Sequence, residues 1–205
     1  MARYRGPRFK VARALGVNVI YHPKLEGESS RLNVRPGEHG RKRKKLSDYG
    51  LRLKEKQKLK AYYGVLEKQF KNYVKKAFNK KGITGENLII ALETRLDNLV
   101  FRFGMGKSLR QARQMVNHGH ILVNGKKVDI PSYACKPGDV ITLRERSKKT
   151  EMFVENMQNG PIFNLDYLEI DKDKFQGTLI DWPTRDVIPV EIHDSYIVEY
   201  YAQRV

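Results

Sequence analysis

The chain has 205 residues, enough for one or two domains with cores of their own, and a formal net charge of +17 at pH 7. The charge is uneven, because residues 1–60 hold 18 Lys and Arg against 5 Asp and Glu, residues 61–150 hold 18 against 7, and residues 151–205 hold 4 against 11. This pattern is typical of proteins that bind nucleic-acid phosphates, and the single cysteine, Cys135, excludes an internal disulfide and a zinc site built on several cysteines.

A membrane-surface protein is the other interpretation of such a charge. It would require an amphipathic anchor or an apolar run approaching the roughly 20 residues of a membrane span, and neither is present. The first eight residues are polar and basic, without the apolar core of a signal peptide. We therefore expect an intracellular protein that makes no membrane contact.

Residues 1–45 are expected to form a basic N-terminal arm. They show no sustained periodicity and are interrupted at Gly6-Pro7 and Arg35-Pro36-Gly37. The segment ends in five consecutive cations, residues 41–45. Such a run is often a solvated or disordered tail, but here it continues into further basic segments, which favours RNA binding.

Residues 46–94 are expected to form a small helical domain. Ser47 is a suitable N-cap for a helix over residues 48–63, which Gly64 would end. A second helix is predicted over residues 66–79, because apolar side chains recur there at i, i+4, i+7 and i+8 along one face. Lysines lie off this face, so the domain presents a basic surface.

Residues 95–157 are expected to form an RNA-binding domain of two helices packed on a small antiparallel sheet, which makes the fold class α+β. The first helix is indicated by an apolar face that runs from Leu92 to Phe103 and is ended by Gly104. Ser108 would cap the second helix and Gly119 would end it. On a helical wheel, its apolar side chains lie opposite one polar, cationic face formed by Arg110, Arg113, Gln114 and Asn117.

A hairpin is predicted directly after the second helix. Its strands are residues 120–123 and 126–130, and they are joined by Asn124-Gly125, the strongest short hairpin signal. A third strand is expected over residues 140–144, after the turn at Pro137-Gly138. The hairpin carries Lys126 and Lys127, which follow closely after the cationic helix in the sequence.

The last segment, residues 158–205, is acidic. Short strands are predicted at 167–170 and 177–180, and the aromatic end, residues 196–201, is expected to pack back onto the body as either helix or strand. Since like charge repels RNA, we expect this segment to face protein or solvent.

Three motifs suggest other chemistry, but each has a simpler interpretation. Residues 104–108 resemble the end of a P-loop, yet Phe101 stands where the first glycine is required. Arg95-Leu96-Asp97 matches the catalytic aspartate motif of pseudouridine synthases, but no length remains for their catalytic domain, so local contacts within a helix are expected. His118 and His120 flank a turn without further ligands nearby, so we expect no metal and no cofactor.

Taken in order, these segments resemble the family of bacterial and plastid small-subunit ribosomal protein four, the uS4 family. The similarity runs from residue 2 to the C-terminus, and pseudouridine synthases and tyrosyl-tRNA synthetases share only the RNA-binding domain. The motifs that carry it are Ala-Arg-Tyr-Arg-Gly-Pro-Arg8, Pro36-Gly-Glu-His-Gly40, Glu55-Lys-Gln-Lys-Leu59, Arg95-Leu-Asp-Asn98, Ala112-Arg-Gln114, Asn117-His-Gly-His-Ile-Leu-Val-Asn-Gly125, Val128-Asp-Ile-Pro-Ser-Tyr133 and Val198-Glu-Tyr-Tyr201.

The resemblance implies a non-enzymatic, primary 16S rRNA-binding protein. Such a protein nucleates assembly of the small-subunit body at a multi-helix junction and contributes to translational accuracy. The partners implied are 16S rRNA, small-subunit ribosomal protein five and other small-subunit proteins, and mRNA near the entry path. The implied location is the ribosome of the cytoplasm or of a plastid.

The chain departs from the family pattern at the N-terminus. Many members bind zinc through four cysteines there, but Phe9 and Ala12 stand where the first two would be, and the others are missing too. This chain therefore resembles a zinc-free form, whose arm must be ordered by RNA and by packing.

The candidate RNA-binding residues fall into three groups. In the RNA-binding domain they are Arg110, Arg113, Gln114, Asn117, His118, Lys126 and Lys127. In the arm they are Arg3, Arg5, Arg8, Arg41, Lys42, Arg43, Lys44 and Lys45, and on the first helix of the helical domain they are Arg52, Lys54, Lys56 and Lys58. Replacing both Arg110 and Arg113 by Glu is expected to weaken RNA binding steeply and to leave the fold intact.

Two other functions stay open at this point. An RNA-modifying enzyme that uses the domain for docking would need a catalytic role for Asp97. A free RNA chaperone or stress factor with the same domain would be found mostly outside ribosomal particles.

Overall fold

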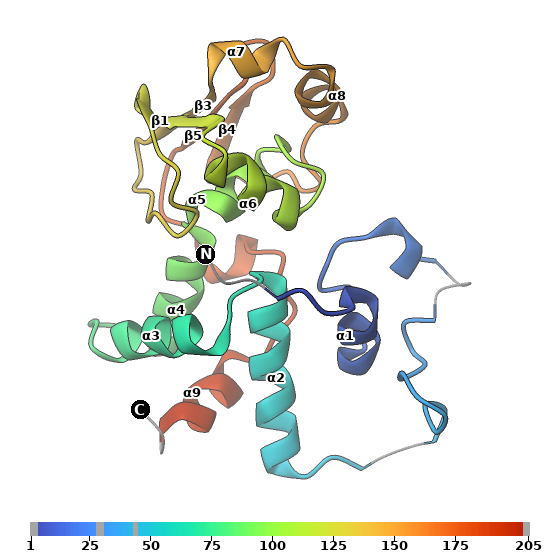
Figure 1. Ribbon diagram of the computed structural model, residues 1–205. Helices are drawn as coiled ribbons and strands as arrows, with labels where there is room; N and C mark the ends of the chain where they lie inside the picture. Colours follow the sequence, from blue (N-terminus) through green and yellow to red (C-terminus); the bar gives the residue numbers. More distant parts are fainter. Residues whose placement is uncertain (1–3, 28–30, 43–44, 203–205) are drawn as a thin grey trace. The chain divides into compact units, whose positions relative to one another are not determined.

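The computed structural model describes residues 4–27, 31–42 and 45–202, and the chain divides into two compact units (Figure 1). Unit 1 consists of Met1–Leu88 and Val190–Val205, and unit 2 of Ile89–Pro189. These units follow spatial contacts, whereas the ranges drawn from the sequence follow charge and motifs. Those sequence-based ranges therefore stay predictions.

Unit 1 is helical. It contains α1 (Arg8–Leu15), the short 3-10 turn η1 (Pro23–Leu25), α2 (Asp48–Tyr62), α3 (Glu67–Phe78), the first half of α4 (Thr84–Glu93) and α9 (Asp194–Ala202). Ser47 caps α2 as predicted, since its Oγ accepts a hydrogen bond from Gly50 N at 3.2 Å. The bounds of α2 and α3 confirm the two predicted helices to within one residue at each end.

The aromatic residues 196–201, for which the sequence left helix or strand open, are helical. Helix α9 packs along α2, and its Ile197 and Tyr201 are buried. The ring of Tyr201 lies 6.0 Å from that of Phe70 on α3, centroid to centroid. The apolar stripe of α3 thus forms core, and α9 closes the core of unit 1.

Unit 2 is an α+β domain, which confirms the predicted fold class. Its helices are α5 (Leu96–Arg102), α6 (Leu109–Asn117), α7 (Glu145–Lys148) and α8 (Glu151–Asn159), and η2 (Arg185–Val187) is a 3-10 turn. Its strands are β1 (Ile121–Val123), β2 (Lys126–Lys127), β3 (Val140–Leu143), β4 (Leu168–Asp171) and β5 (Gln176–Leu179). They form one antiparallel sheet in the order β2-β1-β3-β5-β4.

The sheet is larger than the sequence suggested. Strands β4 and β5 lie within about one residue of the predicted positions, but they pair with β3 and so extend the sheet of the preceding domain. The register places Ile141 opposite both Val123 of β1 and Gly177 of β5. A Cβ at Gly177 would collide with the ring of buried Phe103, so glycine at this position lets the end of α5 pack closely on the sheet.

The predicted second strand of the hairpin is too long. Asn124 and Gly125 adopt positive φ angles of 49° and 76°, as the predicted tight turn requires, but β2 ends at Lys127 instead of residue 130. The chain then leaves the sheet to cap α5, because the carbonyls of Pro131 and Tyr133 accept hydrogen bonds from Asp97 N and Leu96 N. Capping satisfies amide groups that the first turn of a helix leaves unpaired.

The predicted helix through Leu92 and Phe103 is in fact two helices. Helix α4 ends at Glu93 and α5 begins at Leu96, and Arg95 between them is extended and forms an isolated antiparallel bridge with Ala134. Leu92, Leu96 and Leu99 are nevertheless all fully buried. Periodicity predicted the buried face correctly, but it could not detect a break that a residue 39 positions further on stabilises.

Within the described ranges, no helix combines the length and the apolar character that a membrane crossing requires.

Candidate nucleic-acid interface

The predicted polar face of α6 is exposed except at Arg113. Ser108 caps the helix by accepting a hydrogen bond from Gln111 N at 3.3 Å, while Ala112, Met115 and Val116 are buried on the opposite side. The exposed residues at this end of unit 2 are Arg110, Gln114, Asn117 and His118. They combine one permanent cation with amide and imidazole groups that can donate to phosphate oxygens.

The β1–β2 hairpin adds two exposed cations beside the end of α6. The side chain of Lys127 passes so close to Gly119 that a Cβ there would collide with it. Gly119 has a φ of 71°, a backbone conformation that favours glycine. Lys126 and Lys127 are exposed at the edge strand, next to the turn that carries His118.

Arg113, unlike the other polar residues of α6, is largely buried and forms an ion pair inside unit 2. Its guanidinium donates to Asp97 Oδ2 through Nε at 2.7 Å and lies 2.6 Å from it through Nη2. Arg95 binds the same carboxylate through Nε at 3.0 Å and Nη2 at 2.8 Å. Asp97 is 0% exposed, so this cluster ties α6 to α5 inside unit 2.

This cluster changes two sequence-based expectations. Arg113→Glu would place a second carboxylate against buried Asp97, so the double glutamate variant would not keep its fold. Asp97 is also enclosed by the two arginines and has no route to a substrate. The interpretation as an RNA-modifying enzyme therefore loses its catalytic residue.

The cations of α2 are mostly engaged within unit 1. Arg52 pairs with Glu199 at 2.6 Å and Lys58 with Glu55 at 2.6 Å. Lys56 is only 4% exposed; its Nζ lies 2.7 Å from Glu67. That ammonium group also lies over the rings of Tyr200 and Tyr201, at 4.7 and 5.6 Å from their centroids. Arg52 fastens α9 and Lys56 fastens the start of α3 to α2, whereas the Lys58–Glu55 pair lies within α2 itself.

Lys54 is the remaining cation that was predicted on α2. Partial burial and the nearby charges of Lys58 and Arg35 lower its pKa, so cations gather around it. An anion at this point would relieve the repulsion. Lys54 thus fits the predicted role better than Arg52, Lys56 or Lys58 do.

Glu67 links three side chains in unit 1 and yields a test of this packing. Although burial opposes its ionisation, hydrogen bonds from Lys56, Lys60 and Tyr201 lower its pKa to about 2. As pH falls below 4.5 the unfolded chain takes up the proton first, so the stability from Glu67 is present above pH 4.5 and lost towards pH 2. We expect Glu67→Gln to lower the urea midpoint, followed by circular dichroism, at pH 6 and much less near pH 2.

Tyr201→Phe is the matched variant for Glu67, because it keeps the packed ring and removes one of the three hydrogen bonds. It should shift the midpoint in the same direction by a smaller amount. Equal shifts of the Glu67→Gln midpoint at both pH values would contradict the assignment.

Most described cations that were predicted in the N-terminal arm, residues 1–45, are exposed to solvent. Arg5, Arg41, Lys42 and Lys45 are exposed, and Arg8 is half-buried with its guanidinium 5.3 Å from the centroid of Phe9. Arg3, Arg43 and Lys44 lie outside the described residues. Arg13, which was not predicted, donates to the carbonyls of Val34 at 2.9 Å and Arg35 at 3.3 Å and so fixes the second half of the arm to α1.

Phe9 and Ala12, which stand where the family resemblance implied zinc-binding cysteines, have no metal-donor atoms. Phe9 packs edge-on against His22, 5.0 Å between centroids, and Ala12 is buried with Leu15 and Val19. Cys135 is buried, and burial raises the pKa of its thiol to about 12. No group of three or more His, Cys, Asp or Glu that could hold a metal ion occurs in the described part of the chain.

The fold and the exposed face define a basic protein whose second unit is an RNA-binding module. The comparisons with known proteins agree. A family model described as "Ribosomal protein S4/S9 N-terminal domain" matches residues 3–93, and the "S4 domain" model matches residues 94–141.

Two relatives match over their whole length. Small ribosomal subunit protein uS4 of Thermoanaerobacter sp. (strain X514) is 47% identical over 214 residues, which cover 99% of this chain and 100% of that protein. The protein of the same name from Lysinibacillus sphaericus (strain C3-41) is 48% identical over 207 residues, with the same coverage. The chain therefore belongs to the uS4 family of small ribosomal subunit proteins. The prediction of a non-enzymatic, rRNA-binding ribosomal protein is confirmed.

Proposed function

We propose that this protein binds 16S rRNA directly, nucleates assembly of the small-subunit body and contributes to translational accuracy. The exposed polar face of α6, with Arg110, Gln114 and Asn117, carries the proposal. The hairpin cations extend this face in unit 2, and the arm with Lys54 forms a separate basic surface in unit 1.

The mechanism is phosphate neutralisation combined with recognition of RNA shape. Lys and Arg release counterions when they bind phosphates, which gives affinity that falls steeply with salt. Side chains cannot enter the deep, narrow major groove of A-form RNA, so specificity comes from the shape of a folded junction. Each compact unit offers its own basic surface to such a junction.

The proposed partners beyond rRNA are small-subunit ribosomal protein five, other small-subunit proteins and mRNA near the entry path. Acidic residues and half-exposed Trp182 in the last quarter of the chain suit contacts with protein better than contacts with RNA. The proposed location is a ribosome of the cytoplasm or of a plastid.

Binding to 16S rRNA and to an equal length of unrelated structured RNA, across a salt titration, tests the proposal. We expect a preference for 16S rRNA that persists at about 0.15 M salt. Equal affinities that collapse together with salt would favour a free RNA chaperone instead.

The face of α6 is tested in the same assay with Arg110→Gln combined with Lys126→Gln. We expect the slope of log affinity against log salt to fall by roughly 1.5, because each phosphate contact contributes about 0.7–0.9. Lys136→Gln with Lys172→Gln removes the same charge from exposed positions elsewhere in unit 2 and should leave the slope unchanged.

A further inference from the structure

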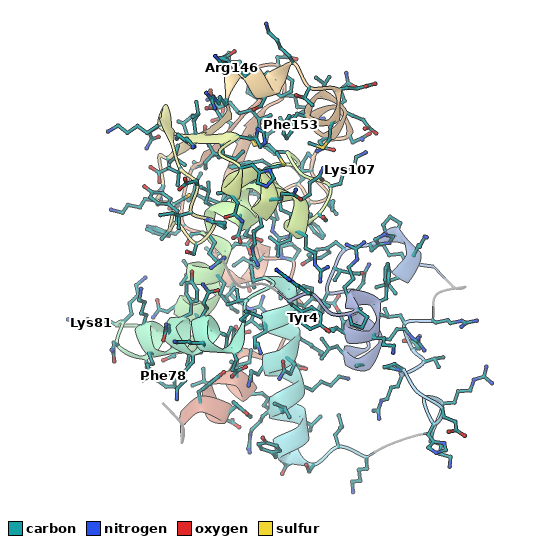
Figure 2. All side chains as sticks on the ribbon, viewed as in Figure 1. Tyr4, Phe78, Lys81, Lys107, Arg146 and Phe153 are labelled. Atoms are coloured by element: carbon teal, nitrogen blue, oxygen red, sulfur yellow. The ribbon has the colours of Figure 1, made fainter. Side chains whose placement is uncertain are left out.

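Residues 144–149, Arg-Glu-Arg-Ser-Lys-Lys, form a basic cluster that lies outside the predicted set. They carry a net charge of +3 and span the short helix α7. Arg144, Arg146 and Lys149 are exposed, whereas Lys148 pairs with Glu145 at 2.6 Å. Figure 2 shows Arg146 on α7 at the surface of unit 2. Neither the core nor the ion pairs of the unit explain these three cations.

The structure fixes this cluster beside the end of α6. Arg144 N donates to the carbonyl of His120 at 2.8 Å, and the Nδ1 of His120 lies 2.9 Å from the Oγ of buried Ser147. The ring of His120 also packs against Phe153 of α8, 5.2 Å between centroids. His120 thus fastens α7 and α8 to the turn between α6 and β1.

The exposed ring of His118 connects the two surfaces. It lies 6.1 Å from the ring of His120, centroid to centroid, on the turn that follows Asn117. Burial and the charges of His118 and Arg144 lower the pKa of His120, which places both side chains close to it. The polar face of α6 therefore continues through His118 to Arg144.

The position of Arg144 also offsets the partial negative charge at the C-terminal end of α6. The C-terminal end of a helix carries partial negative charge, which disfavours phosphate near Asn117 and His118. Arg144 supplies a permanent positive charge at this end, and the hydrogen bond from its backbone N–H to the carbonyl of His120 fixes the position of the residue. A cation here lets a phosphate backbone follow the whole face of α6 instead of leaving it at Asn117.

We propose that Arg144, Arg146 and Lys149 form a second phosphate-binding surface of unit 2, which receives the sugar-phosphate backbone of RNA that runs on from α6. The inference rests on the proposed rRNA binding and adds the α7 cluster to its surface. The occupant is RNA, because three exposed cations adjoin a face that already presents an arginine and amide groups.

The first test is the triple variant Arg144→Gln, Arg146→Gln and Lys149→Gln, titrated with 16S rRNA across salt. We expect the salt slope to fall by about 2 and the affinity to fall by on the order of tenfold or more near 0.1 M salt. The control, Lys136→Gln with Lys172→Gln and Lys174→Gln, removes the same charge from exposed positions of unit 2. Equal slopes for the triple variant and the parent would overturn the inference.

The second test locates the RNA directly. Buried Cys135 has a raised pKa, so Arg146→Cys gives one reactive thiol to which iron-EDTA can be attached. We expect hydroxyl radicals from this position to cut 16S rRNA at a defined site, and a probe on Lys172→Cys to give no cut there. No localised cut from position 146 would again overturn it.

The outcomes also separate this inference from the proposed function. If the parent shows no preference for 16S rRNA, the proposed function fails. If the parent shows the preference and the triple variant binds with parental affinity and slope, only the role of α7 fails. The fluorescence of Trp182, the single tryptophan, reports in each variant whether unit 2 is still folded.

Discussion

Asp97→Ala is expected to lower the free energy of unfolding of unit 2 by about 3–5 kcal/mol, the usual cost of removing one partner from a buried ion pair. Asp97 is completely buried and binds both Arg95 and Arg113 at distances of 2.6–3.0 Å. Its loss would leave two arginines without this carboxylate, one of them only 1% exposed. Asp97 also stands in the first turn of α5, where negative charge is favourable.

A urea titration followed by the fluorescence of Trp182 measures this effect, because the only tryptophan lies in unit 2. Glu155→Ala is the matched control. It removes an ion pair with Lys107, also 2.8 Å long, whose side chains are more than half exposed, so less than about 1 kcal/mol is expected. A loss in Asp97→Ala no larger than in this control would contradict the assigned role.

The same substitution should weaken rRNA binding without changing which phosphates are bound. Arg113 fixes α6 to α5, and α6 presents Arg110, Gln114 and Asn117. Once α6 can move, the protein must order this face during binding, which costs affinity. The salt slope should stay close to the parental value, whereas Arg110→Gln lowers it. This difference separates a positioning residue from one that touches RNA.

Sequence patterns predicted most of the elements because those patterns are local. The period of α3, the Ser108 cap and the Asn124-Gly125 turn each depend on residues within a few positions of one another. The break before Leu96 depends on Ala134 and on the carbonyls of a distant loop, so no local period could show it.

Charge alone predicted the RNA-binding residues less completely. Lys56 and Lys54 both read as basic positions on one helix, yet Lys56 is buried against Glu67 and two tyrosines. The partner of Arg52, Glu199, is 147 positions away. A sequence shows which side chains are cationic, but only tertiary contacts show which of them already have a carboxylate. The α7 cluster was missed because the sequence shows its cations but does not show that they lie beside the end of α6.

Replacing Arg8, Arg41, Lys42 and Lys45 together by Gln is expected to give the largest loss of rRNA affinity. Arg41, Lys42 and Lys45 are exposed and Arg8 is half-buried, and the carbonyls of residues 34 and 35 hold the second half of the arm through Arg13. Four lost phosphate contacts would lower the salt slope by about 3 and the affinity by on the order of a hundredfold or more near 0.1 M salt.

The control replaces four exposed lysines of the same unit, Lys68, Lys75, Lys76 and Lys81, by Gln. Both variants have the same net charge, so any nonspecific attraction to RNA falls equally in the two. If the arm variant loses no more affinity than this control, the arm contributes only general charge. A larger loss with a lower slope would mean that the arm binds particular phosphates. Arg13→Ala removes the hydrogen bonds that hold the carbonyls of residues 34 and 35, so it should then reproduce part of the affinity loss. Arg13 itself is not counted among the phosphate ligands.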